Sequence, residues 1–189
     1  MVRLLCFAGS LRRASLNKQL AALAAERARA LGAEVTLVDL KDFPLPVYDG
    51  DLEEESGIPE HGVRLKELFV AHDGLLLSCP EYNSSITGAL KNAIDWVSRP
   101  ASNEPPLVAF RGKTAALLAA SPGALGGLRG LVTVRSILGN LGVIVVPSQL
   151  AVPRAHEVLK DGALTDPGQD KSLARVVQEL VETTDKLKA

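Results

Sequence analysis

The feature that most constrains the fold of this chain is a repeated alternation of short apolar runs with longer helical patterns. Near-continuous apolar runs occupy Val2 to Ala8, Gly74 to Ser78 and Thr114 to Ala120, as is typical of strands buried on both faces of a parallel sheet. Glu34 to Leu40 alternates apolar and polar residues, and Val143 to Val146 is a further apolar run. These segments are predicted to be the strands of one sheet.

Helical patterns separate the predicted strands. Apolar residues at helical spacing predict helices over Ser15 to Leu31, His61 to His72, Ile86 to Val97, Leu128 to Leu141 and Ser172 to Leu187. Alternation of this kind favours a three-layer α/β sandwich, with helices covering both faces of a parallel sheet. We predict a five-stranded sheet in the spatial order 2-1-3-4-5, within a single domain spanning residues 1–189.

One predicted connection, Asp42 to Glu60, is longer than the others. Its length and its prolines suggest a functional or interfacial loop, or short helical turns that the pattern does not reveal. Tyr48 lies within it, and aromatic residues make up only 4% of the chain. The sequence leaves open whether Tyr48 serves a site or packs over the rim of the fold.

Charge and composition exclude several classes of function. The chain carries 21 Lys and Arg against 22 Asp and Glu, so it lacks the basic excess of nucleic-acid-binding proteins. No segment has the length of a membrane span, and Met1 leads into a predicted strand rather than a signal peptide. Cys6 and Cys79 lie at or near the ends of apolar runs, which favours buried free thiols. We therefore expect a cytoplasmic protein without nucleic-acid partners or membrane insertion.

The turn from Ala8 to Asn17 is the strongest candidate for a binding site. It joins a strand to a helix N-terminus, where free backbone N–H groups and the helix dipole favour an anion. Ser10, Ser15 and Asn17 can add neutral hydrogen bonds, and Arg12 or its neighbour Arg13 can add a charged one. We interpret this turn as a phosphate cradle. The alternative is that Ser15 is only an N-cap and the arginines are solvated.

Two further polar turns follow the third and fourth predicted strands. Pro80 to Ser85 offers N–H donors, a tyrosine ring and an asparagine amide, which suits a heteroaromatic ring with a polar edge. The alternative is a helix entry in which Ser84 or Ser85 caps the helix from Ile86. Ser121 to Gly127 is the other turn. Because the carboxyl ends of parallel strands share one edge, all three turns are predicted to form a single site.

Other nucleotide-binding motifs fail on their spacing. A dinucleotide-binding Gly-x-Gly-x-x-Gly motif needs closely spaced glycines after the first strand, and only Gly9 is present. Gly112-Lys113-Thr114 matches the end of a P-loop, but Leu107 stands where its first glycine belongs.

Hydrolase and metal sites are also disfavoured. Ser121 lies in a strand-turn-helix setting like a nucleophile elbow, but no Asp or Glu occurs between it and His156, so the usual order of catalytic residues is broken. His61, His72 and His156 are widely scattered and lack metal-ligand spacing, so no metal is expected.

Taken together, these motifs closely resemble the NADPH-dependent FMN reductases, a flavodoxin-like group that includes quinone and chromate reductases. The resemblance rests on Gly9-Ser10-Leu11-Arg12 with Ser15 and Asn17, on Pro80-Glu81-Tyr82-Asn83, on the segment Gly88 to Trp96, and on Ser121-Pro122-Gly123 with Gly126-Gly127. It extends from the first strand to about Val146.

The resemblance implies a role for each matching position. Ser10, Arg12, Ser15 and Asn17 are expected to hold the FMN phosphate. Pro80, Glu81, Tyr82 and Asn83 are expected to line the isoalloxazine ring, and Ser121 and Gly123 to approach the flavin from the third turn. Members of this family are usually homodimers or homotetramers, so a homo-oligomer is expected.

The implied activity is an FMN-dependent NAD(P)H oxidoreductase. NADPH or NADH would pass hydride through FMN to small-molecule electron acceptors such as quinones or flavins, with the flavin supplying the chemistry. The alternative is a non-enzymatic electron carrier of the flavodoxin type. Such carriers are strongly acidic and hold the flavin between aromatic residues, whereas this chain is nearly neutral and has one Trp, two Tyr and four Phe.

Overall fold

A five-stranded parallel sheet forms the centre of the molecule. The structure, a computed structural model, describes residues 1–101 and 103–188. The strands run in the order β2-β1-β3-β6-β7, and every neighbouring pair is parallel. Their bounds are β1 Arg3–Ala8, β2 Glu34–Asp39, β3 Gly74–Ser78, β6 Thr114–Ala120 and β7 Ile144–Val152. The strands β4 and β5 form a separate hairpin described below, so β6 and β7 are the fourth and fifth strands of this sheet in chain order. The predicted order 2-1-3-4-5 is confirmed.

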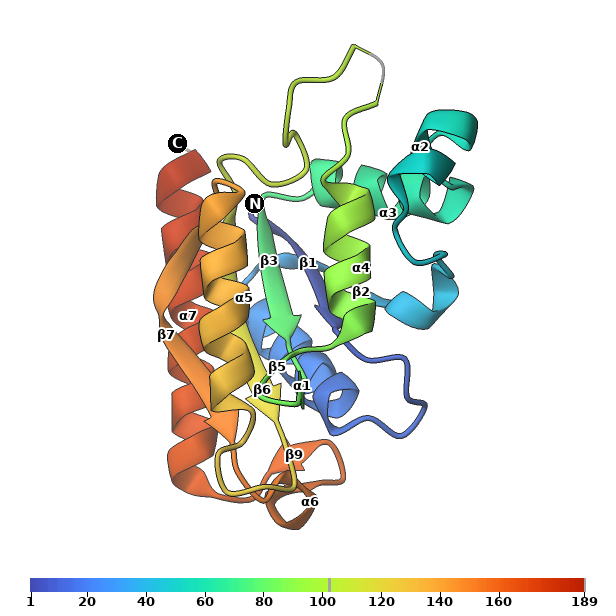
Figure 1. The fold of residues 1–189 in the computed structure, drawn as a ribbon. Helices are drawn as coiled ribbons and strands as arrows, with labels where there is room; N and C mark the ends of the chain where they lie inside the picture. The colour runs from blue at the N-terminus through green and yellow to red at the C-terminus, as the bar shows by residue number, and fades with distance from the viewer. Residues whose placement is uncertain (102, 189) are drawn as a thin grey trace.

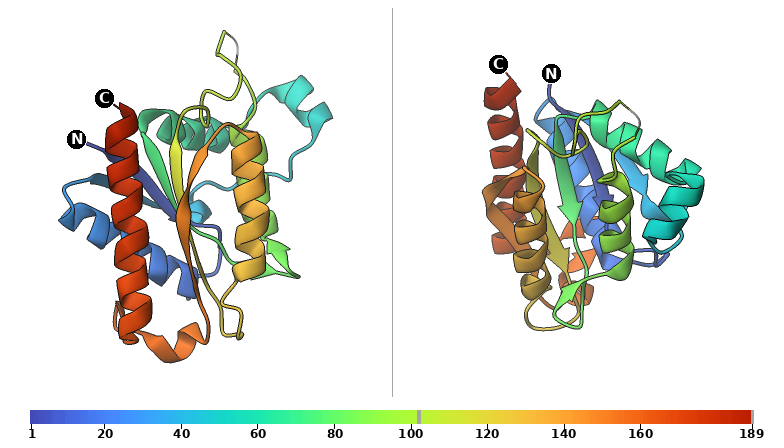
Figure 2. Two further views of the ribbon diagram at one scale, coloured as in Figure 1. Left: turned by 90° about the vertical axis from the view of Figure 1, so that its left-hand side faces the viewer. Right: turned by 45° about the horizontal axis from the view of Figure 1, so that its top comes forward.

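Helices cover both faces of the sheet, as predicted (Figure 1). Helices α1, Leu16–Ala30, and α7, Pro167–Lys188, pack on one face. Helices α3, Glu60–Ala71, α4, Gly88–Val97, and α5, Leu128–Asn140, pack on the other. Seen nearly edge-on, the sheet lies between α7 and α5 (Figure 2, left).

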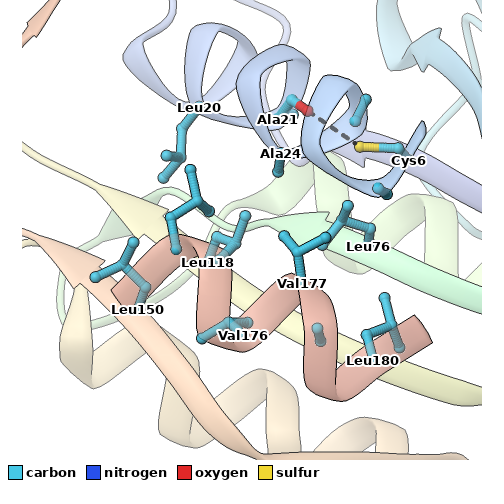
Figure 3. Close-up of a cluster of buried hydrophobic side chains, with 14 of the residues drawn as sticks. Cys6, Leu20, Ala21, Ala24, Leu76, Leu118, Leu150, Val176, Val177 and Leu180 are labelled. Carbon is cyan, nitrogen blue, oxygen red and sulfur yellow. Dashed lines mark hydrogen bonds between the residues drawn. The ribbon is translucent and has the colours of Figure 1, made fainter. Parts of the chain in front are cut away.

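The core under α1 and α7 shows why nearly all of β1, β3 and β6 is apolar. Leu76 and Leu118 of the sheet pack with alanines of α1 and valines of α7 in one buried cluster (Figure 3). The Cys6 thiol is fully buried there and donates to the Ala21 carbonyl oxygen at 3.3 Å, and burial raises its pKa to about 12. Cys6 and Cys79 are both free and buried, as expected.

Strand β7 is longer than the predicted segment Val143 to Val146. Pro147 follows the predicted segment and cannot donate a ladder hydrogen bond. In the structure the strand bulges past this proline: Val145 pairs with Ala115, and pairing resumes at Gln149 opposite Leu117. As β7 is an edge strand, it tolerates the proline and continues to Val152.

Helix α7 begins at Pro167 rather than at the predicted Ser172. The Asp166 carboxylate accepts a hydrogen bond from the N–H of Gln169 at 2.8 Å, which makes it an N-cap. Proline fits the first helical position because its missing N–H would be unbonded there anyway.

Several short elements lie between the predicted ones. They are η1 Leu40–Asp42, α2 Gly50–Ser56, α6 Ala155–Val158, the hairpin of β4 Glu81–Tyr82 with β5 Ser85–Ile86, and the hairpin of β8 Leu159–Lys160 with β9 Ala163–Leu164. Helix α2 lies within the long Asp42 to Glu60 connection, for which short helical turns were one of the alternatives left open by the sequence. Among the described residues, no helix is both long and apolar enough to cross a membrane.

The long connection is fastened to α4. The Pro46 carbonyl oxygen accepts hydrogen bonds from the side chains of Asn92 and Trp96, each at 2.8 Å. The Tyr48 ring meets Trp96 edge-on with centroids 5.0 Å apart, and its hydroxyl donates to Glu53 at 2.8 Å. These contacts favour the packing interpretation of Tyr48 over a direct role in a site.

Candidate functional site

The three polar turns meet at the carboxyl edge of the sheet, at the lower end of Figure 1. The N–H of Gly9 donates to the Ser78 carbonyl oxygen at 2.9 Å, and the N–H of Cys79 donates to that of Leu118 at 2.7 Å. The Thr87 hydroxyl donates to the Gly9 carbonyl oxygen at 2.6 Å. The turns after β1, β3 and β6 are therefore neighbours, as the sequence predicted.

The first turn has the features of an anion site. Ser15 is the N-cap of α1, and its hydroxyl accepts from the N–H of Lys18 at 3.4 Å. The N–H groups of Leu16 and Asn17 open the helix and have no intrahelical acceptor, so they can donate to an anion together with the positive end of the dipole. Ser10 is buried, Arg12 is exposed, and no carboxylate among the described residues pairs with Arg12. Capping by Ser15 and anion binding are therefore compatible.

Asn17 is placed differently from the other predicted phosphate ligands. Its side chain is buried, and its amide is hydrogen-bonded to the backbone of Ala120 and to the Ser78 hydroxyl. It joins the ends of β3 and β6 to α1.

The second turn is a tight hairpin. Glu81 pairs with Ile86 and Tyr82 with Ser85, which leaves Asn83 and Ser84 at the tip with φ of 52° and 64°. Two successive positive φ values are those of a type I′ turn. The Tyr82 side chain at this edge is 53% exposed, so its ring is available to a flat ligand.

The hairpin also corrects the expected helix cap. Neither Ser84 nor Ser85 caps the next helix, because both belong to the hairpin. Thr87 is the N-cap: its hydroxyl accepts from the N–H of Leu90 at 3.1 Å while donating to Gly9. Sequence reasoning missed Thr87, although a threonine before an apolar helical run is a cap signal.

Glu81 faces α5. Its carboxylate accepts from the backbone N–H groups of Arg129 and Gly130 at 3.0 and 3.2 Å and from the Arg129 guanidinium. Burial tends to raise the pKa of Glu81, but these hydrogen bonds outweigh it and the pKa is lowered. Gly127, the N-cap of α5, has no side chain, so Glu81 supplies the capping oxygens. Glu81 thereby fixes the hairpin to α5.

The third turn, Ser121 to Gly127, is held in place by contacts with the end of β7 and the start of α6. The Ser121 hydroxyl accepts from the N–H of Gly123 at 3.0 Å, and the Ser121 carbonyl oxygen accepts from the N–H of Ala155 at 3.0 Å. Gly126 has φ of 64°, and a Cβ there would lie 2.6 Å from the carbonyl carbon of Val152. The close approach requires glycine and keeps this turn against the end of β7.

The hydrolase interpretation gains no support from this geometry. The Ser121 hydroxyl is hydrogen-bonded to the backbone N–H of Gly123, not to a histidine. His156, the histidine downstream of Ser121, is exposed, and its Nε2 lies 3.6 Å from the Glu157 carboxylate. The described residues contain no group of three or more His, Cys, Asp or Glu positioned to hold a metal ion.

A five-stranded parallel sheet of this order, with three polar turns meeting at its carboxyl edge, defines a flavodoxin-like protein. Comparisons with known proteins give the same class. Residues 2–157 match the family described as NADPH-dependent FMN reductase. A quinone reductase of Escherichia coli is 35% identical over 165 residues, covering 82% of this chain and 84% of the relative. An NAD(P)H-dependent FMN reductase of Pseudomonas aeruginosa is 39% identical over 145 residues, covering 75% and 72%.

A solved structure extends the likeness to nearly the whole chain. The flavoenzyme FerB, an NAD(P)H:(acceptor) oxidoreductase from Paracoccus denitrificans, superposes with a TM-score of 0.81 at 30% identity, covering 98% of both chains. The chain belongs to the NADPH-dependent FMN reductase family. The predictions of FMN as cofactor and of an NAD(P)H-dependent oxidoreductase are confirmed, and the electron-carrier alternative is disfavoured.

Proposed function

We propose that this chain catalyses electron transfer from NAD(P)H to quinones or free flavins, with FMN held along the carboxyl edge of the sheet. The observation that carries the proposal is the convergence there of an anion-ready turn and an exposed aromatic hairpin. When bound, the flavin supplies the hydride chemistry. The names of the relatives, which include quinone reductases, support the choice of acceptor.

The first turn would hold the phosphate. The open N–H groups of α1, the hydroxyls of Ser10 and Ser15, and the Arg12 guanidinium provide neutral and charge-assisted donors within one turn of chain. The donor set fits a phosphate dianion, because these residues supply hydrogen bonds and positive charge and no carboxylate.

The second and third turns would hold the ring. Pro80 is buried and fixes the backbone, while Tyr82 and Asn83 present a ring and an amide at the open edge. Ser121 and Gly123 lie in the neighbouring turn. Glu81 contributes by fastening the hairpin to α5 through the backbone N–H groups of Arg129 and Gly130.

We also propose that residues 1–189 work as one cytoplasmic domain that assembles into a homodimer or homotetramer. Helix α5 supports the assembly, because Leu128 and Val132 are 43% and 63% exposed one helical turn apart. Exposed apolar side chains in such a row are a common feature of subunit contacts.

The experiment begins with the visible spectrum of the purified protein titrated with FMN. Binding should shift the flavin bands and quench flavin fluorescence. The loaded protein should then oxidise NADPH, followed by its absorbance, when a benzoquinone or free FMN is supplied. No binding of FMN would overturn the cofactor site, and binding without turnover of NADPH or NADH would overturn the enzymatic proposal.

A further inference from the structure

Asn17 is a buried amide at the point where the three turns of the site meet. Its Nδ2 donates to the Ala120 carbonyl oxygen at 2.8 Å, and its Oδ1 accepts from the Ala120 N–H at 3.0 Å. The same Oδ1 accepts from the Ser78 hydroxyl at 2.9 Å. Only 4% of the residue is exposed. One side chain thus connects the start of α1 to the last residues of β3 and β6.

The orientation of this amide is fixed by the backbone. Ala120 presents one N–H and one carbonyl oxygen, whose roles cannot be exchanged. In a flipped amide, Oδ1 would face the Ala120 carbonyl oxygen and Nδ2 would face the Ala120 N–H, so acceptor would meet acceptor and donor would meet donor. The two hydrogen bonds between Asn17 and Ala120 resemble those that a residue of a neighbouring strand would make. They lie at the end of β6, just before the Ser121 turn begins.

These contacts leave the side chain little capacity to serve a ligand. Both lone pairs of Oδ1 and one of the two N–H groups of Nδ2 are used, so a single N–H of a residue that is 4% exposed is all that the side chain could offer a phosphate. The neighbouring Ser10, Ser15 and Arg12 have no comparable link between strands.

We propose that Asn17 is a positioning residue, which fixes the Ser121 turn and the end of β3 in place relative to the phosphate turn. Its side chain is not a phosphate ligand. This inference rests on the proposed function. If so, the loss of the Asn17 side chain weakens the binding of the flavin ring as much as the binding of the phosphate.

A pair of flavins separates the two roles. Riboflavin has the same ring as FMN and lacks the phosphate. In fluorescence titrations, Asn17→Ala should weaken the binding of both flavins by a similar factor, roughly tenfold or more for the loss of several buried hydrogen bonds. The matched control Arg12→Ala should weaken the binding of FMN and leave that of riboflavin unchanged. If Asn17→Ala weakens only FMN binding, or neither, the proposal is wrong.

Ser78→Ala is a second variant that keeps the amide and its bonds to Ala120. Ser78 is fully buried at the end of β3, and its hydroxyl donates to Asn17. This variant should weaken both flavins together by a smaller factor, even if Asn17→Ala does not fold. Unchanged binding of both flavins would contradict transmission through Asn17.

Asn17→Asp supplies a rescue that a general loss of packing would not show. Protonated, the acid can donate to the Ala120 carbonyl oxygen and accept from its N–H, as the amide does; ionised, it faces that carbonyl oxygen with negative charge. Burial favours the protonated form. At about pH 5, Asn17→Asp should therefore bind riboflavin more tightly than Asn17→Ala, and the advantage should shrink as the pH rises. No advantage at pH 5 would overturn the proposal. Failure of the wild-type chain to bind FMN would instead overturn the proposed function.

Discussion

At the residue scale, Arg12 carries the charge of the proposed phosphate site. Its side chain is exposed and lies in a turn whose other donors, apart from the neighbouring Arg13, are neutral. A charge-assisted hydrogen bond contributes about 1.5–3 kcal/mol, so Arg12→Ala should weaken FMN binding roughly 10- to 100-fold. Fluorescence titration with FMN measures the effect, which should decrease with added salt.

The control for Arg12 is the same substitution at Arg111. Arg111 is also exposed but precedes β6, so it lies at the opposite edge of the sheet. Arg111→Ala should leave FMN affinity unchanged. Equal losses from both variants would indicate a general effect of net charge rather than a contact at the first turn.

The backbone conformation of Ser84 leads to a prediction about stability. It occupies the left-handed region with φ of 64°, where a Cβ costs about 1 kcal/mol and glycine has no such penalty. Ser84→Gly should raise the free energy of unfolding by about 0.5–1 kcal/mol in urea denaturation. Asn83→Gly should gain less, because asparagine tolerates this region. A loss of stability in Ser84→Gly would show that the Ser84 side chain makes a contribution that outweighs the strain.

Residues of the site were predictable from sequence only where their chemistry is local. Ser15 could be recognised as a cap and a candidate anion donor because its partner lies three positions away. The bonds of Asn17 reach Ala120, 103 positions along the chain, and those of Glu81 reach α5. No local pattern contains such partners, so their placement needed the fold.

At the element scale, the buried strands β3 and β6 were predicted to the residue, β1 was predicted one residue too long, and the two-residue strands were not predicted. β3 and β6 are apolar apart from Ser78 and Thr114 at their ends and are bounded by turn residues, so their limits are encoded locally. The β4–β5 hairpin is too short to show a period, and its Asn-Ser tip lacks the glycine typical of such turns. The continuation of β7 beyond Pro147 depends on contacts made by another element.

That other element is α5, through Arg135. Its guanidinium donates to the carbonyl oxygens of Val145 and Val146 at 3.3 and 3.0 Å and to the Gln149 side chain. These carbonyls lie in the bulge, where the ladder to β6 is interrupted. Arg135→Met keeps the apolar stem and removes the donors, so it should lower the free energy of unfolding by about 1–3 kcal/mol in urea.

Arg175 provides the matched control for Arg135. It lies exposed on α7, and its guanidinium makes no hydrogen bond to any of the described residues. Arg175→Met should change stability by no more than about 0.5 kcal/mol. If Arg135→Met is equally harmless, the bulge carbonyls are satisfied without the guanidinium.

At the scale of the whole molecule, Asp73 joins the two ends of the chain. Its carboxylate accepts from the N–H of Arg3 in β1 at 2.8 Å and from the Lys188 amine at the end of α7 at 2.7 Å. Lys188 also donates to the Met1 carbonyl oxygen at 3.0 Å. The first strand and the last helix therefore share one anion, next to the start of β3.

Acid should release this link. Burial tends to raise the pKa of Asp73, but the hydrogen bonds from Lys188 and Arg3 outweigh it and lower the pKa from 3.8 to about 2. A carboxyl with a lowered folded pKa stabilises the fold above its unfolded value, and this contribution disappears as the pH falls from about 4 to 2. Because both cationic partners are partly exposed, we expect Asp73→Asn to cost about 1–2 kcal/mol at pH 7.

Urea denaturation across pH 2 to 7 checks this prediction. The stability curves of the wild-type chain and of Asp73→Asn should lie apart at pH 7 and meet near pH 2, because the protonated wild-type carboxyl no longer attracts either cation. Asp95→Asn removes the Lys91 pair on the surface of α4 and should cost no more than about 0.5 kcal/mol. If the gap between wild type and Asp73→Asn stays constant down to pH 2, the contribution of Asp73 is not electrostatic. The two ends of the chain would then be held by packing of α7 and β1 alone.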